Sequence, residues 1–378
     1  MCGTRTARED HRHEAIELLD RVDASRLILL MDRLRLGGLL GRRLLDLGPS
    51  LDPWLEAQIG ARMDRAGKNG TAHELISLAL LTGLDHAGIR ALGLKGSILA
   101  RQVYDDPGAR TAGDIDILVA AADLDRAIEV VQQMGWRHER HASRTTRLPV
   151  LHETLGRPDL PRVELHWRVH WYETKFATDA LARAERPAPH QPLVMQAADG
   201  VAALMLFYAR DGFFGLRMAA DVAAWWDARC AGVDPDVLID PVATSYPGLA
   251  GPLEVARSLL RDLVGLPTRA EAAGVRRRLA GQLATPFADL EPAQVLANAS
   301  LVDLLLAPRG HLGDAVGREL QKIPENLERR LTVQDGLHPY LERSEHALRM
   351  LRRWAMALLP ALLKMWQPGS ATAEDRRA

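Results

Sequence analysis

The segment from Leu92 to Val119 constrains the fold of this chain more than any other. In its second half, Asp114 and Asp116 alternate with Ile115 and Ile117. A strand sends successive side chains to opposite faces, so both carboxylates share one face and both isoleucines enter a core. Two neighbouring carboxylates repel each other, and a cation between them relieves that repulsion. Oxygen ligands of this kind suit Mg²⁺ that is shared with substrate phosphates.

A second feature precedes this strand. Residues 92–94 are predicted to form a short buried strand, and Gly96-Ser97 lies at the turn into a helix that continues to Tyr104. A helix start presents free N–H groups and a positive dipole end, which favours a phosphate. Gly96 would let a phosphate approach the backbone, and Ser97 could donate its hydroxyl. An Asp-x-Asp strand is usually a solvated face and a Gly-Ser pair is usually a cap, so the combination is more specific than either part.

These motifs resemble the nucleotidyltransferase fold of the DNA polymerase β type, which has a Gly-Ser turn, a paired acid on one strand and a third acid on a later strand. A longer pattern is similar to a bacterial family of uncharacterised nucleotidyltransferases with a Lys-Gly and an Arg-x-x-x-Asp-x-Asp signature. Members of that family are often encoded near genes for lasso peptide or exopolysaccharide biosynthesis. The matching positions are Lys95-Gly96-Ser97, Tyr104, Pro107, Arg110, residues 114–119, Ala127 and Gly135.

The resemblance implies a third acid, and the segment 162–171 supplies a candidate. Its apolar residues alternate with polar ones, so one face is predicted to enter the core and the other to be polar. We expect it to pair with a strand over residues 148–154. Glu164 stands where the pattern places the third acid. His166 lies one pleat further on the same face and could contact a phosphate or leaving group, although a strand histidine of this kind is more often a spectator.

The implied reaction is transfer of a nucleoside monophosphate, AMP in the first instance, from an NTP to an acceptor hydroxyl on a peptide or small molecule of a biosynthetic pathway. Asp114, Asp116 and Glu164 would be catalytic and would hold Mg²⁺ or Mn²⁺. Two alternatives stay open: a non-catalytic scaffold or sensor that binds nucleotide, and a toxin-type enzyme that modifies tRNA or protein. The residues implied for nucleotide binding are Lys95, Gly96, Ser97 and Arg110.

The predicted fold class is α+β: a small mixed sheet of the polymerase-β-like nucleotidyltransferase type with N-terminal helices and a large C-terminal helical region. Apolar spacing predicts two or three helices between residues 11 and 47, one that begins after Pro53, and further helices over 71–88, 121–134, 199–208 and 216–226. We divide the chain into an N-terminal helical region (1–70), a nucleotidyltransferase core (71–186), a C-terminal helical domain (187–367) and a disordered tail (368–378).

Two polar regions outside the strands have open interpretations. The helix pair that follows the Pro-rich segment 187–192 resembles the helix-loop-helix after the catalytic sheet of the same family. There Asp221 could brace the cleft or form a buried pair with Arg217, and Tyr208 or a neighbour stands where family members commonly carry a histidine. The basic connection over residues 137–147 either contacts a triphosphate or is a solvated loop.

Composition limits the setting and the partners. The chain has 48 Lys and Arg against 49 Asp and Glu, so it lacks the net basic charge that bulk nucleic-acid binding usually needs. Two cysteines, Cys2 and Cys230, indicate no structural disulfide and fit a reducing cytoplasm. The polar N-terminus lacks the apolar stretch of a signal peptide. The apolar run 354–366 is too short to span a membrane, so we expect a cytoplasmic protein without a membrane span.

Overall fold

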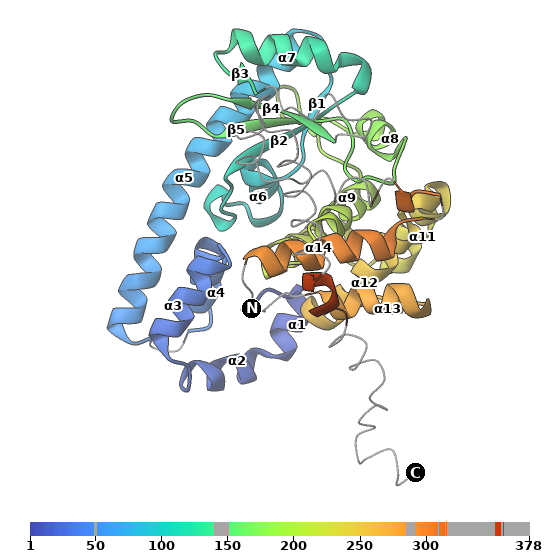
Figure 1. Ribbon diagram of the computed structural model, residues 1–378. Coiled ribbons are helices and arrows are strands. Elements are labelled where there is room, and N and C mark those ends of the chain that lie inside the picture. Colours follow the sequence, from blue (N-terminus) through green and yellow to red (C-terminus); the bar gives the residue numbers. More distant parts are fainter. Residues whose placement is uncertain are drawn as a thin grey trace, which may run out of the picture.

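A computed structural model describes residues 1–48, 51–139, 151–284, 292–308, 310–313, 315, 352–356 and 358 of the 378-residue chain. The architecture is α+β, as predicted: one five-stranded mixed sheet with helices before and after it in the chain. Figure 1 shows α7 above this sheet, α6 below it, and the C-terminal helices grouped on one side beneath it. The basic connection over 137–147 and the predicted tail lie wholly or mostly outside the described residues.

The sheet has the strand order β1-β2-β5-β4-β3. Strands β2 and β5 are parallel, and the other neighbouring strands are antiparallel. The alternation of Asp114–Val119 places its isoleucines in the core beneath α5 and α7, as expected from the strand period. The opposite face of the sheet therefore carries the polar side chains toward α6. The strands are β1 (Ala91–Gly93), β2 (Asp114–Val119), β3 (Arg137–His138), β4 (His152–Gly156) and β5 (Arg162–His166).

Strand β5 is shorter than the predicted strand 162–171. It ends at His166, which pairs with His152, the first residue of β4. Beyond it, the carboxylate of Glu173 accepts hydrogen bonds from the backbone N–H of Val169 (2.9 Å) and of Ala177 (3.1 Å). A buried carboxylate therefore satisfies the N–H of Val169, which a longer strand would have paired, and an N–H at the start of the next helix, α8 (Phe176–Arg183). The partner strand predicted over 148–154 is β4, and residues 148–150 lie outside the described part of the chain.

The separate helices predicted after Pro53 and over 71–88 are one helix, and that expectation was wrong. Helix α5 (Pro53–His86) runs for 34 residues without a break. Asp52 caps it by accepting the N–H groups of Trp54 and Leu55 at 2.9 and 3.2 Å. At 1.5 Å per residue the helix is about 50 Å long. It connects the sheet to α3 and α4 and passes through residue 70, where the sequence suggested a boundary (Figure 1).

Gly70, in the middle of α5, serves close packing instead of ending the helix. A Cβ on Gly70 would lie 2.2 Å from the carbonyl oxygen of Pro107. Pro107 opens the short turn η1 (Pro107–Ala109), which connects α6 (Gly96–Tyr104) to β2. The glycine thus lets the long helix contact the segment that leads to the acidic strand.

The remaining helices surround a buried central helix, α9 (Ala197–Arg210). Every residue of α9 from Asp199 to Ala209 is buried, because α10, α11, α12 and α14 all contact it. Helices α2 to α4 and the start of α5 form a separate core that also takes in Leu216 and Ala220 of α10. The predicted helix over 121–134 is confirmed as η2 (Ala121–Asp123) followed by α7 (Leu124–Gln133), and the predicted pair over 199–208 and 216–226 as α9 and α10.

The other helices have the following bounds: α1 (Arg5–Asp10), α2 (Arg12–Leu19), α3 (Ala24–Arg33), α4 (Gly37–Leu45), α8 (Phe176–Arg183), α10 (Leu216–Trp225), α11 (Pro235–Ser245), α12 (Ala250–Val264), α13 (Gly274–Leu283) and α14 (Pro292–Leu306). A short π-helical turn, Trp226–Cys230, extends α10. Within the described residues, no helix combines the length and the apolar character needed to cross a membrane.

Candidate active site

Three carboxylates meet on the polar face of the sheet. Asp114 and Asp116 lie on β2, and the register of the parallel pair sets Asp116 directly opposite Glu164 on β5. One oxygen from each carboxylate lies within 4.8 Å of the others. The structure therefore brings together the three acids that the sequence singled out, although Asp116 and Glu164 are 48 positions apart in the chain.

Lys95 lies against the most buried of these acids. Its ammonium Nζ is 2.9 Å from Oδ1 of Asp116, and the two side chains are 10% and 2% exposed. The same ammonium lies 4.4 Å from the centre of the Phe207 ring, which α9 places beneath it. A cation over an aromatic face and beside a carboxylate is stabilised by both. Lys95 therefore neutralises Asp116 in the absence of any other cation.

His166 is enclosed between two of the acids. Its Nε2 atom lies 3.0 Å from Oδ1 of Asp116 and 3.2 Å from Oε2 of Glu164, and the side chain is fully buried. Phe207 packs edge-on against the ring, with centroids 6.0 Å apart. Burial beneath α9 directs the imidazole into the acidic cluster.

A second histidine was missed by the sequence analysis. His152 faces His166 across the β4–β5 pair, with ring centroids 4.8 Å apart, and its Nε2 is 3.7 Å from Oε1 of Glu164. His152, Glu164 and His166 form a second cluster whose ligand atoms lie within 4.8 Å of one another. The only signal in the sequence was the antiparallel pairing expected for the two strands, and its register could not be read from local pattern.

Comparison with known proteins bears on this arrangement. A family model described as an uncharacterised nucleotidyltransferase matches residues 20–264, well over half of the chain. The match includes β1, α6, β2 and β5, with all three acids. The chain belongs to this uncharacterised nucleotidyltransferase family. A comparison with curated proteins gave no match.

The Gly-Ser turn of this family member begins α6, directly after Lys95. Gly96 has φ +70°, a conformation that side chains rarely adopt, so a glycine is required where the chain leaves β1. Ser97 is 2% exposed, and its Oγ has no hydrogen-bond partner among the described residues. Leaving a buried hydroxyl unpaired costs about 1–3 kcal/mol. The first turn of α6 therefore offers an unused donor together with free backbone N–H groups.

Arg110 is buried against α10 and does not face an open cleft. Its Nε donates to Oδ2 of Asp221 at 2.6 Å, and the two side chains are 5% and 1% exposed. The Tyr104 hydroxyl donates to the other oxygen of Asp221 at 3.3 Å. The pair that the sequence suggested between Asp221 and Arg217 is replaced by this one, because Arg217 instead donates to the Thr111 carbonyl at 3.0 Å. Both arginines thereby fix residues 110–113, the loop that leads into β2.

The charge state of the candidate site follows from burial and these contacts. Burial favours the neutral form of Asp116, but Lys95 and His166 outweigh it and hold the pKa of Asp116 well below its usual value. Burial and the neighbouring Asp116 raise the pKa of Asp114. Burial and His166 lower the pKa of His152 to about 4. At neutral pH Asp116 is ionised and His152 is a neutral imidazole, the form that can bind a metal.

The donor set fits a divalent metal in two overlapping ways. The three carboxylates Asp114, Asp116 and Glu164 provide the oxygen ligands that Mg²⁺ and Mn²⁺ prefer. The second cluster adds imidazole nitrogen from His152 and His166, which suits transition metals better than Mg²⁺. Glu164 belongs to both clusters. The residues present therefore match the metal requirement expected of this family.

Proposed function

We propose that this protein transfers a nucleoside monophosphate, AMP from ATP, to an acceptor hydroxyl on a peptide or small molecule of a biosynthetic pathway. The family supports nucleotidyl transfer as the reaction class. The observation that carries the assignment to this site is the register of β2 and β5, which sets Asp116 opposite Glu164 with Asp114 on the same face. The Gly-Ser start of α6 lies next to that face through Lys95.

Each group in the site has a role in this proposal. Asp114, Asp116 and Glu164 would hold Mg²⁺ or Mn²⁺, which when bound stabilises the attacking and leaving oxygens. Ser97 Oγ and the N–H groups of the first turn of α6 bind the β- and γ-phosphates, since a helix N-terminus favours anions. Lys95, once separated from Asp116, pairs with the phosphate charge. Residues 110–113, fixed by Arg110 and Arg217, keep the acidic strand in position.

The bonds and the proton are accounted for as follows. The acceptor oxygen attacks the α-phosphorus, the bond from that phosphorus to the bridging oxygen breaks, and pyrophosphate leaves. The proton of the acceptor hydroxyl passes to the carboxylate of Glu164. His152, with its Nε2 3.7 Å from Oε1 of Glu164, stays neutral at pH 7 and leaves Glu164 as the proton acceptor.

The test is release of pyrophosphate with Mg²⁺ or Mn²⁺, each of the four NTPs, and candidate acceptors that include peptides, small alcohols, tRNA and protein. Asp114→Ala/Asp116→Ala should abolish release and the nucleotide mass gain on the acceptor. Asp125→Asn removes an exposed carboxylate from α7 and should leave both unchanged. Metal-dependent NTP binding without release from any acceptor would favour the scaffold or sensor alternative. A nucleotide mass on tRNA or protein alone would favour the toxin-type alternative, and absence of NTP binding would overturn the site.

A further inference from the structure

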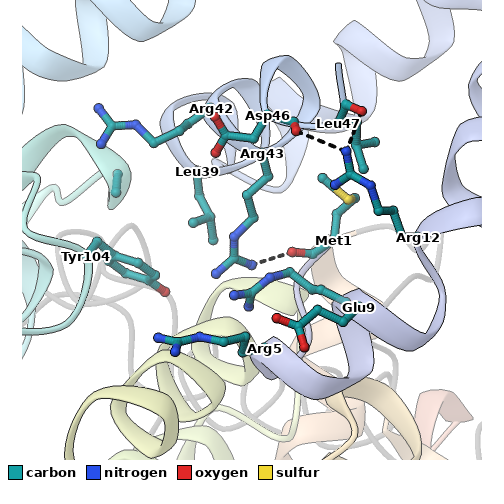
Figure 2. A pocket seen from close by; sticks show the side chains of 12 residues that line it. Met1, Arg5, Glu9, Arg12, Leu39, Arg42, Arg43, Asp46, Leu47 and Tyr104 are labelled. Carbon is teal, nitrogen blue, oxygen red and sulfur yellow. Dashed lines mark hydrogen bonds between the residues drawn. The ribbon is translucent and has the colours of Figure 1, made fainter. Parts of the chain in front are cut away.

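A pocket rich in arginine lies at the far end of α6 from the Gly-Ser turn. It has a volume of about 260 Å³ and is formed by α1, the start of α2, α4 and the end of α6. Figure 2 shows Arg43 from α4 and Arg5 from α1 reaching into the space beside Tyr104. Glu9 and Asp46 are the carboxylates in its lining, whereas the whole chain has a net charge of −1. The arginines in the lining are Arg5, Arg8, Arg12, Arg42 and Arg43.

Backbone carbonyl groups hold these arginines in place without neutralising them. Arg43 donates to the carbonyl of Met1, and Arg12 donates to the carbonyl of Leu47 at 2.7 Å. Such hydrogen bonds fix the direction of a guanidinium and leave its positive charge intact. The pocket therefore contains pre-oriented donors, and most of the lining charge has one sign.

Carboxylates compensate only part of this charge. Arg42 pairs with Asp106 at 2.8 Å, and Arg8 lies 3.6 Å from Asp227. In the described part of the chain, the guanidinium groups of Arg5 and Arg43 make no ion pair. An anion that entered the pocket would meet both of them.

The uncompensated charge in the pocket destabilises the ionised form of Arg43. Burial and the nearby Arg8 both lower its pKa, since each opposes the charged form of the guanidinium. The group also lies over the Tyr104 ring, 6.0 Å from its centre. A half-buried cation that faces another cation is stabilised when an anion binds between them.

We propose that this pocket binds a small phosphate-bearing anion. Several arginines that converge from different helices suit a phosphate group, because the planar fork of each guanidinium can donate two hydrogen bonds to phosphate oxygens. The pocket is separate from the candidate active site: Tyr104 and Gly96 are the last and first of the 9 residues of α6, about 12 Å apart at 1.5 Å per residue. The inference stands without the proposed function.

Calorimetry with the full chain tests the proposal. The probes are inorganic phosphate, pyrophosphate and ATP, each titrated in EDTA at constant ionic strength so that metal-dependent binding at the acids is absent. Loss of one charged donor should weaken binding at least about tenfold in Arg43→Gln and in Arg5→Gln. Arg5 is exposed, so its variant keeps the test valid if Arg43→Gln does not fold. Arg26→Gln, which removes an exposed arginine from α3, is the matched control and should bind like the unaltered protein.

The relative affinities of the probes distinguish the source of the phosphate, and the acid variant tests where on the protein the probes bind. Tighter binding of phosphate or pyrophosphate indicates an inorganic anion, and tighter binding of ATP indicates a nucleotide. Asp114→Ala/Asp116→Ala should bind the probes unchanged, even if the proposed transferase activity is absent. Equal affinity in the arginine variants and the unaltered protein, loss of binding in the acid variant, or no saturable binding of any probe would each overturn the proposal.

Discussion

The ammonium of Lys95 lies 2.9 Å from Asp116 Oδ1, in the middle of the acidic face. Any divalent metal that Asp116 binds must therefore compete with this lysine for the same oxygen. Under the proposed function Lys95 has two states, one in which it pairs with the Asp116 carboxylate and one in which it pairs with the phosphates of a nucleotide.

Substitution of Lys95 tests its effect on metal binding and its effect on nucleotide transfer. Lys95→Met removes the competing cation, so we expect Mn²⁺ to bind about tenfold more tightly, or better, without nucleotide. The same change removes a positive charge from the phosphates, so nucleotide transfer should fall. Mn²⁺ binding is measured by electron paramagnetic resonance, and Lys68→Met, at an exposed position of α5, is the control. Unchanged Mn²⁺ affinity in Lys95→Met would contradict the competition.

The pH dependence of stability should carry the signature of His152. Its pKa in the folded protein is about 4, against about 6.5 in an unfolded chain. Between these values the unfolded state binds more protons, so the free energy of unfolding rises with pH and is lost as pH falls from 6.5 toward 4. The contribution is about 2 kcal/mol between pH 7 and pH 4.5. Urea unfolding at both pH values measures it, and His152→Gln should reduce the difference; an equal difference in the variant would assign the effect elsewhere.

The buried Arg110–Asp221 pair should be sensitive to loss of one partner. Asp221→Ala leaves a buried guanidinium uncompensated, and we expect a loss of about 3–5 kcal/mol of unfolding free energy. A double variant, Arg110→Met with Asp221→Leu, should lose less than the sum of the single changes, because no unpaired charge remains.

Urea unfolding of these variants is compared with Arg126→Met, which removes a surface pair with Asp123 (2.9 Å) and should change stability by at most about 1 kcal/mol. Additive losses in the double variant would show that the two side chains do not interact as described.

Two glycines of α5 form a matched pair for close packing. A Cβ on Gly70 would meet the Pro107 carbonyl, whereas a Cβ on Gly60 would meet nothing within 4 Å. Gly70→Ala should therefore destabilise the protein by about 1–3 kcal/mol. Gly60→Ala should stabilise it by up to about 1 kcal/mol through helix propensity. Thermal unfolding compares the two variants. Stabilisation by both would contradict the prediction, because it would show that η1 moves away from residue 70 without loss of stability.

Much of the candidate site follows from local pattern. The period of two in Asp114-Ile115-Asp116-Ile117 determines that the acids face one way and the isoleucines the other, whatever the strand pairs with. The Gly-Ser turn and the apolar helix after it predict α6 and its free N–H groups. These features depend on residues a few positions apart, and a single sequence contains them in full.

Other features arose only from long-range packing. The close approach of α5 to η1 depends on Gly70 against Pro107. Glu173 satisfies the N–H of Val169 beyond the end of β5, and Asp221 pairs with Arg110, the arginine that lies buried beside it. His152 joined the site because β4 pairs with β5 in one particular register. By itself, the sequence determined which side chains share a face. The tertiary structure decided which faces meet, because that choice depends on contacts between residues that are distant in the chain and compete for the same buried space.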